Sequence, residues 1–128
     1  MLCQVPGNLK NSYSVDMCVE EEDQARYDAD ILNNINPSGL PPHHLQLKKG
    51  AVIILIRNLS VKFGHCNGTR YIVQDISNRL IHARKLNRGV NDIIIIPKIK
   101  LCSKDTDFHA VFSRKQFPVM LAFYLTFH

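Results

Sequence analysis

The sequence lacks tryptophan, and it has no apolar run long enough to cross a membrane. Its most apolar stretch, residues 119–127, is far shorter than the roughly 20 residues of a membrane-spanning helix. The N-terminus has no basic segment followed by an apolar one, so we expect no secretory signal peptide. With 45% hydrophobic and 21% charged residues in 128, the composition is that of one folded domain with no membrane partner.

The cysteines show neither a metal-site spacing nor a disulfide pattern. There are four of them: Cys3, Cys18, Cys66 and Cys102. None forms a Cys-x-x-Cys pair, which is typical of zinc sites. His43 and His44 are adjacent, but neighbours in an extended chain point to opposite faces, and no third ligand follows at a suitable spacing. We therefore expect free thiols in a reducing compartment and no bound metal.

No catalytic motif is present either. The phosphate loop G-x-x-x-x-G-K-[ST] is missing, and its nearest approach, residues 6–12 (PGNLKNS), lacks the second glycine and the adjacent Lys-Ser/Thr pair. A Walker B motif requires an Asp-Glu pair in an apolar strand context, and the sequence has no such pair. Asp105 and Asp107 lie in a hydrophilic loop, where solvated carboxylates are expected rather than a catalytic pair. We expect the chain alone to be catalytically inactive and to bind no cofactor.

What the sequence does have is a β-rich centre between residues 32 and 73. The apolar run Ala51–Ile56, preceded by a turn at Gly50, predicts a strand buried on both faces. Asn67 and Gly68 accept positive φ and predict a tight turn, and residues 70–76 follow as a second strand.

Further short strands are predicted on both sides of this centre. Residues 45–47, 80–86, 93–96 and 99–101 fit strands, with 93–96 as a buried run, and Pro97 fits only a sheet edge or a bulge. A short helix is predicted at residues 28–34, and the prolines of residues 37–42 mark a domain boundary. Five or six strands at spacings of about ten residues favour a small closed or nearly closed barrel.

Charge is unevenly distributed. Residues 1–50 carry a net −3 and residues 51–128 a net +8, which suggests a polyanion as partner for the β-rich part. On charge alone, a solvated surface with no partner is the favoured interpretation. Single-strand binders combine a basic groove with stacking aromatics, here Phe63, Tyr71 and Phe108. The candidates for contact with DNA phosphates are Arg57, Lys62, Arg70, Arg84, Lys85 and Arg88, with Arg79, Lys98 and Lys100 as further basic residues. The alternative is a free-standing β-barrel module that binds a protein or RNA.

Several motifs together resemble the Pif-type (petite-integration-frequency) DNA helicases, and within them the variety carried by Helitron transposons. They are PSGLPPHxLxLKxG from Pro37, a buried strand ending in RNL, CNGTR from Cys66, Tyr13-Ser14-x-Asp16, and RKQFPVMLAFYLT from Arg114. The resemblance covers nearly the whole chain. Val52, where the family usually has proline, and Met120, where it often has arginine, depart from the pattern.

The resemblance implies a mainly β fold, namely a small SH3-like barrel with short flanking pieces of a RecA-like α/β motor domain. Residues 39–112 would be the barrel (the 2B subdomain), residues 1–38 a flank of the second motor domain, and residues 113–128 its returning strand. The barrel would help to hold single-stranded DNA, while the missing motor domains use ATP and magnesium. A nuclear location is implied, with a mitochondrial one as the alternative.

The last residues raise a separate question. In the family, the strand resembling residues 122–128 runs into a Lys-[Ser/Ala]-Gln-Gly motif, whereas this sequence stops at His128. The apolar strand 119–127 would lie inside a sheet in a complete protein. Either the chain is a truncated product, or this strand packs against the barrel in a way the family does not use. We favour truncation, and expect the flanking gene sequence to encode that motif downstream and a phosphate loop upstream.

Overall fold

Strands dominate the computed structural model, as the sequence predicts. It describes residues 9–19, 29–37, 39–86, 93–103 and 112–124. The elements are β1 Lys10–Tyr13, β2 Val15–Cys18, α2 Ala29–Asn33, β3 His44–Leu47, β4 Ala51–Leu55, the 3-10 helix η1 Val61–Phe63, β5 Arg70–Ile76, β6 Leu80–Lys85, β7 Ile93–Pro97, β8 Ile99–Cys102, β9 Phe112–Gln116 and β10 Val119–Tyr124. No helix among the described residues is both long and apolar enough to span a membrane.

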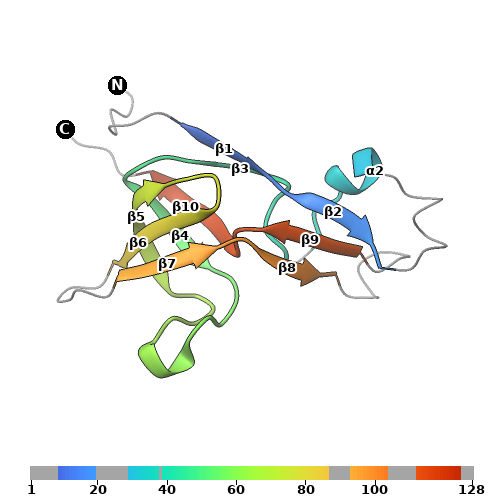
Figure 1. Ribbon diagram of the computed structural model, residues 1–128. Helices are drawn as coiled ribbons and strands as arrows, with labels where there is room; N and C mark the ends of the chain where they lie inside the picture. Colours follow the sequence, from blue (N-terminus) through green and yellow to red (C-terminus); the bar gives the residue numbers. More distant parts are fainter. Residues whose placement is uncertain (1–8, 20–28, 38, 87–92, 104–111, 125–128) are drawn as a thin grey trace.

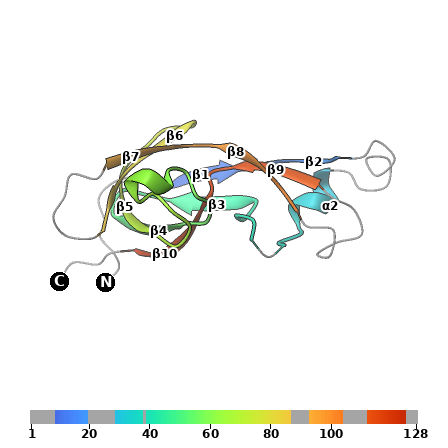
Figure 2. The ribbon, with the colours of Figure 1, turned by 90° about the horizontal axis from the view of Figure 1, so that it is seen from below.

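The strands form three antiparallel sheets with the orders β10–β4–β5–β6–β7, β2–β9–β8 and β1–β3. The five-stranded sheet lies at one end of an elongated molecule, and the three-stranded sheet lies at the other end beside α2 (Figures 1 and 2). The β1–β3 ribbon extends along the top of the view in Figure 1. The predicted mainly β fold class is therefore confirmed.

The main core lies on one face of the five-stranded sheet. β4 is its central element, and Ala51, Val52, Ile53 and Leu55 are fully buried, which confirms the predicted buried strand. β3 covers this face because its alternate residues point inward. The cluster is formed by Leu45, Leu47, Ala51, Ile53, Leu55, Tyr71, Val73, Ile81, Ala83, Ile94, Ile96, Phe117 and Val119.

The sheet is open rather than closed into a ring. Its edge strands are β10 and β7, and no pairing between them occurs in the part of the chain that the structure describes. β7 was predicted to be buried throughout, but it alternates: Ile94 and Ile96 are buried, whereas Ile93 and Ile95 are 56% and 52% exposed. An edge strand with one solvated face accounts for this alternation. Pro97 ends this edge strand, as predicted.

β10, the apolar strand near the C-terminus, lies beside β4 in the five-stranded sheet. It pairs with β4 from Val119↔Leu55 to Tyr124↔Ala51, with an irregularity after Leu121. Without β10, β4 would be an edge strand, and its backbone N–H and C=O groups on that side would lack partners. β10 supplies these partners. Within this chain β10 is thus part of the five-stranded sheet, and the domain boundary near residue 112 stays a prediction.

The three-stranded sheet has its own small core, formed by Cys18, Leu32, Leu40, Leu101 and Phe112. The same sheet carries a buried charge pair between β2 and β9, which was not predicted from the sequence. The guanidinium of Arg114 on β9 donates from Nε to Asp16 Oδ1 (2.8 Å) and from Nη2 to Asp16 Oδ2 (2.9 Å), and both side chains are fully buried. Arg114 also donates to the backbone carbonyls of Leu32 in α2, Ile35 just after it and Pro41 in the proline segment, so one side chain joins β2, β9, α2 and the proline segment.

Candidate nucleic-acid interface

The connection between β4 and β5 folds on itself into a compact projection, residues 58–69, which we call the lobe. A β-bridge closes it: Ser60 N–H donates to His65 O (3.0 Å) and His65 N–H donates to Ser60 O (2.8 Å). Between them, η1 forms the tip, where Gly64 N–H donates to Val61 O (3.0 Å) with φ +79° at Gly64. The lobe is the green segment that projects at the bottom of Figure 1.

The base of the lobe is a turn that the Asn67-Gly68 pair predicted. Thr69 N–H donates to Cys66 O (3.0 Å), and Gly68 N–H donates to Leu55 O (2.7 Å), which ties the turn to the end of β4. Gly68 has φ +97°, whereas Asn67 keeps a negative φ. The turn thus needs positive φ only at the glycine, as in a type II turn.

Gly68→Val is expected to destabilise the chain by about 1–3 kcal/mol, because a β-branched residue is strained at positive φ. A built Cβ at Gly68 meets no atom within 4 Å, so the loss would be conformational rather than steric. Gly68→Asn is the matched control, since asparagine tolerates this region better. Urea unfolding measures both; equal midpoints for the two variants would contradict this account of the turn.

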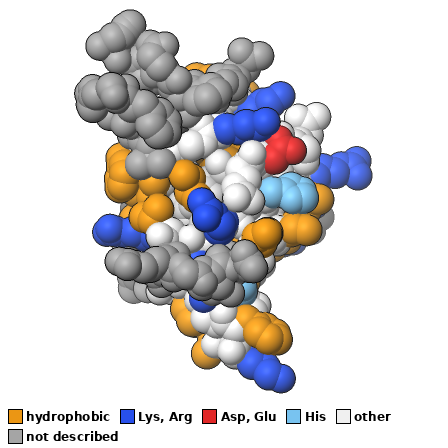
Figure 3. Space-filling view, turned by 90° about the vertical axis from the view of Figure 1, so that its left-hand side faces the viewer, with side chains coloured by type: hydrophobic (Ala, Val, Ile, Leu, Met, Phe, Trp, Pro, Cys, Tyr) orange, Lys and Arg blue, Asp and Glu red, His pale blue; other side chains and the backbone are white. Residues whose placement is uncertain are grey.

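The tip of the lobe exposes apolar and basic side chains together. Val61 is 66% exposed and Phe63 65% exposed, and Lys62 Nζ lies 5.7 Å from the centre of the Phe63 ring. Figure 3 shows hydrophobic and basic side chains on the projection below the body of the molecule. An exposed ring offers a face on which a nucleic-acid base can stack, and the adjacent cation adds a favourable charge.

A hollow of about 560 Å³ lies at the base of the lobe. It is lined by Gly64, Gly68, Thr69, Arg70, Lys85 and Leu86. Lys85, from the end of β6, reaches across and donates from Nζ to Phe63 O (3.1 Å), which fixes the tip relative to the sheet. A Cβ at Gly64 would lie 2.5 Å from Lys85 Nζ, so the glycine permits this close approach.

The hollow and the tip can act on one ligand in different ways. Arg70 is exposed and can donate to a phosphate oxygen, and the charge of Lys85 adds to the positive potential of the hollow. Phe63 offers a ring face to a base. No described residue that lines the hollow is acidic, so its potential favours an anion.

The structure brings together three of the six predicted DNA-contact residues, Lys62 at the tip and Arg70 and Lys85 in the hollow. Arg57 is half-buried and donates to Ile56 O (2.8 Å). Arg84 is exposed on β6 opposite Ile72 and Ile93, and does not line the hollow.

Other predicted residues fall elsewhere. Arg88 and Phe108 lie outside the described residues. Tyr71 is fully buried, and its hydroxyl is 2.8 Å from His65 Nδ1, so its ring is not available for stacking. Thr69 and Leu86 also line the hollow, and no sequence signal distinguished them because neither is charged or aromatic.

Comparisons with known proteins agree with this architecture. The model of the family described as "DNA helicase Pif1, 2B domain" matches residues 30–76, which include the whole lobe. The crystal structure of Pif1 helicase from Candida albicans is similar with a TM-score of 0.62 and 23% identity, over 94% of this chain and 30% of that one. The crystal structure of Bacteroides Pif1 bound to single-stranded DNA is similar with a TM-score of 0.57 and 23% identity, over 93% of this chain and 26% of that one.

Unliganded Pif1 from Bacteroides sp gives a TM-score of 0.57 at 22% identity, over 88% of this chain and 32% of that one. The chain therefore spans less than a third of each of these structures, and their likeness shows a shared fold. No curated protein matches the sequence. Residues 30–76 thus match the model of the Pif1 2B domain, and the chain shares the fold of part of the solved Pif1 helicases.

Proposed function

We propose that the chain is part of an ATP-dependent DNA helicase, in which the lobe and the hollow hold single-stranded DNA during unwinding. The observation that carries this proposal is the exposed ring of Phe63 beside a hollow lined by Arg70 and Lys85. The lobe lies within the segment that matches the 2B domain. A relative of the same fold, Bacteroides Pif1, was solved bound to single-stranded DNA, which supports this class of ligand.

In this proposal the lobe binds DNA without regard to sequence. A phosphate lies in the hollow against Arg70 and the charge of Lys85, and a neighbouring base stacks on Phe63. Stacking tolerates every base because each has a π-face, and phosphates carry no sequence information. Lys62, beside the ring, adds a charge next to the stacked base.

The described residues of this chain do not fit the ATP and magnesium that a complete helicase of this kind would use. A phosphate loop must lead into a helix N-terminus. The described part of its nearest approach instead leads into β1, where Lys10 to Ser12 pair with β3. We therefore assign ATP hydrolysis to other parts of the helicase and derive no step for it here.

Phe63→Ala is expected to weaken binding of a fluorescent oligothymidylate by about 1–3 kcal/mol, or roughly 5- to 150-fold, because one base loses its stacking surface. Val61→Ala is the matched control, since Val61 is equally exposed on the same tip but has no ring. Fluorescence anisotropy at fixed salt measures both. Equal affinities for the two variants would overturn the assignment of the tip.

The alternative function, a free-standing module that binds a protein or RNA, makes a different prediction about salt. Single-stranded DNA binding weakens with salt with a log–log slope of about −0.7 per phosphate contact, whereas a largely apolar protein interface shows little slope. The Helitron affiliation and the nuclear location, with mitochondria as the alternative, are also proposals. Imaging of the tagged chain would decide between the two compartments.

A further inference from the structure

A second basic surface lies at the opposite end of β5 from the lobe. β5 begins at Arg70, beside the hollow, and ends at Ile76, six positions or about 20 Å away. There the turn between β5 and β6 meets the β1–β3 ribbon and the start of β8. Two cavities of about 290 Å³ and 600 Å³ occupy this junction and lie side by side, because Asn78 and Lys98 line both; together we call them the groove.

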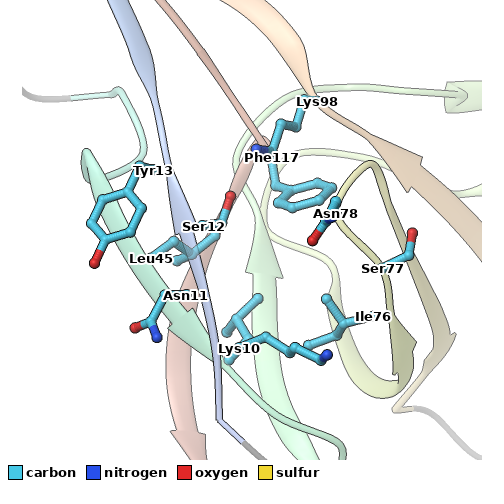
Figure 4. A pocket seen from close by; sticks show the side chains of 11 residues that line it. Lys10, Asn11, Ser12, Tyr13, Leu45, Ile76, Ser77, Asn78, Lys98 and Phe117 are labelled. Atoms are coloured by element: carbon cyan, nitrogen blue, oxygen red, sulfur yellow. The ribbon is translucent and has the colours of Figure 1, made fainter.

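Cations lie along the whole length of this groove. Lys10 lines only the first cavity, Arg79 and Lys115 line only the second, and Lys98 lines both. Figure 4 shows Lys10 extending from β1 toward Ile76 at one end of the first cavity. Lys98 and Phe117 lie at its other end, next to Asn78 (Figure 4).

These charges are not neutralised within the groove. No aspartate or glutamate is among the described residues that line either cavity. Burial, together with the nearby charge of Lys115, lowers the pKa of Lys98. A group of like charges held at this junction would be stabilised by an incoming anion.

We propose that this groove binds the phosphate backbone of nucleic acid as a second site, separate from the lobe. Cations in series along two joined cavities suit a linear polyanion better than a single small anion. The groove also offers neutral donors, Asn11, Ser12, Ser77 and Asn78, for phosphate and sugar oxygens. Two aromatic rings line the first cavity: Phe117 is 1% exposed, and Tyr13, which is 54% exposed, stacks on His44 with ring centres 4.6 Å apart. The contacts that we propose for the groove are therefore with phosphate and sugar oxygens, without regard to base.

The test compares two double variants of the full chain. Lys10→Gln/Lys115→Gln removes one exposed cation from each cavity. Lys49→Gln/Lys100→Gln, the matched control, removes two exposed lysines that line neither cavity. The probes are a fluorescent oligothymidylate and an abasic deoxyribose-phosphate oligomer of the same length, each titrated at several salt concentrations. Circular dichroism checks that the variants keep the fold.

The groove variant is expected to lower the log–log salt slope by about 1.4 for both probes, which corresponds to two phosphate contacts at about 0.7 each. The control is expected to leave the slope unchanged. Equal slopes for the groove variant and the control would overturn the proposal. Phe63→Ala separates the two sites, because it should weaken binding of the oligothymidylate but not of the abasic oligomer. Failure of the lobe is thus distinguishable from failure of the groove.

Discussion

Arg114→Met is expected to destabilise the chain by about 3–5 kcal/mol, because it leaves the Asp16 carboxylate buried without its partner. Both side chains are fully buried and joined by two short hydrogen bonds. The same guanidinium satisfies the carbonyls of Leu32 and Ile35 through Nη2, at 3.0 and 2.9 Å, and that of Pro41 through Nη1 at 3.1 Å. Urea unfolding followed by circular dichroism measures the loss.

Two further variants make this prediction specific. Lys115→Met changes the next residue of β9, which is exposed, and is expected to shift stability by less than about 0.5 kcal/mol. Arg114→Met/Asp16→Leu removes both charges and is expected to be less destabilised than Arg114→Met alone, since no unpaired charge remains. A loss for Arg114→Met no larger than that for Lys115→Met would contradict the structural role of the pair.

Gln116→Leu is expected to cost about 2–4 kcal/mol, because a leucine of similar size removes the hydrogen bond of the buried Phe117 N–H and the part-buried ones to Ser12 and His43. Gln116 is fully buried. Its Oε1 accepts from Ser12 Oγ (2.8 Å) and from the backbone N–H of Phe117 (2.9 Å). Its Nε2 donates to the carbonyls of Ser12 (3.1 Å) and His43 (3.0 Å), which connects β9 to the β1–β3 ribbon.

Gln74→Leu is the matched control, because Gln74 is exposed on β5 and the same substitution leaves no buried group unpaired. Its stability should stay within about 0.5 kcal/mol of the parent chain. The same urea titration serves for both variants. Equal midpoints for Gln116→Leu and Gln74→Leu would show that the buried amide contributes little.

The strands were predictable from the sequence because each carries its own local signal. Ala51–Ile56 is a continuous β-branched run, and residues 70–76 and 80–86 follow clear turn residues, so β4, β5 and β6 form where expected. Which strands pair depends on contacts between distant residues. Hence the pairing of β10 with β4, and the exposure of Ile93 and Ile95 on an edge strand, were not predicted.

The burial of Arg114 and Gln116 could not be predicted from the sequence either. Arg114 and Gln116 stand in a segment, RKQFP, that gives no sign of burial in the sequence, because buried arginine and glutamine are uncommon. Only the fold brings Asp16, 98 residues away, to the guanidinium.

The candidate site was predictable in part for the same reason. Its charges and the Asn67-Gly68 turn are visible in the sequence. The joining of Arg70 and Lys85 at one hollow depends on the pairing of β5 with β6, where Tyr71 faces Lys85. Arg84, one residue earlier, pairs with Ile72 farther along β5 and does not line the hollow.

Chemical-shift mapping of the isotopically labelled chain with oligothymidylate tests the central claim most directly, because it reports where DNA binds. The account predicts that the backbone amides of Phe63, Gly64 and Arg70, in the lobe and the hollow, shift progressively as the oligonucleotide is added. It also predicts that these shifts diminish as salt is raised, since phosphate contacts weaken with salt. Binding of the oligonucleotide without any shift in residues 58–70 would contradict the claim that the lobe and the hollow hold single-stranded DNA.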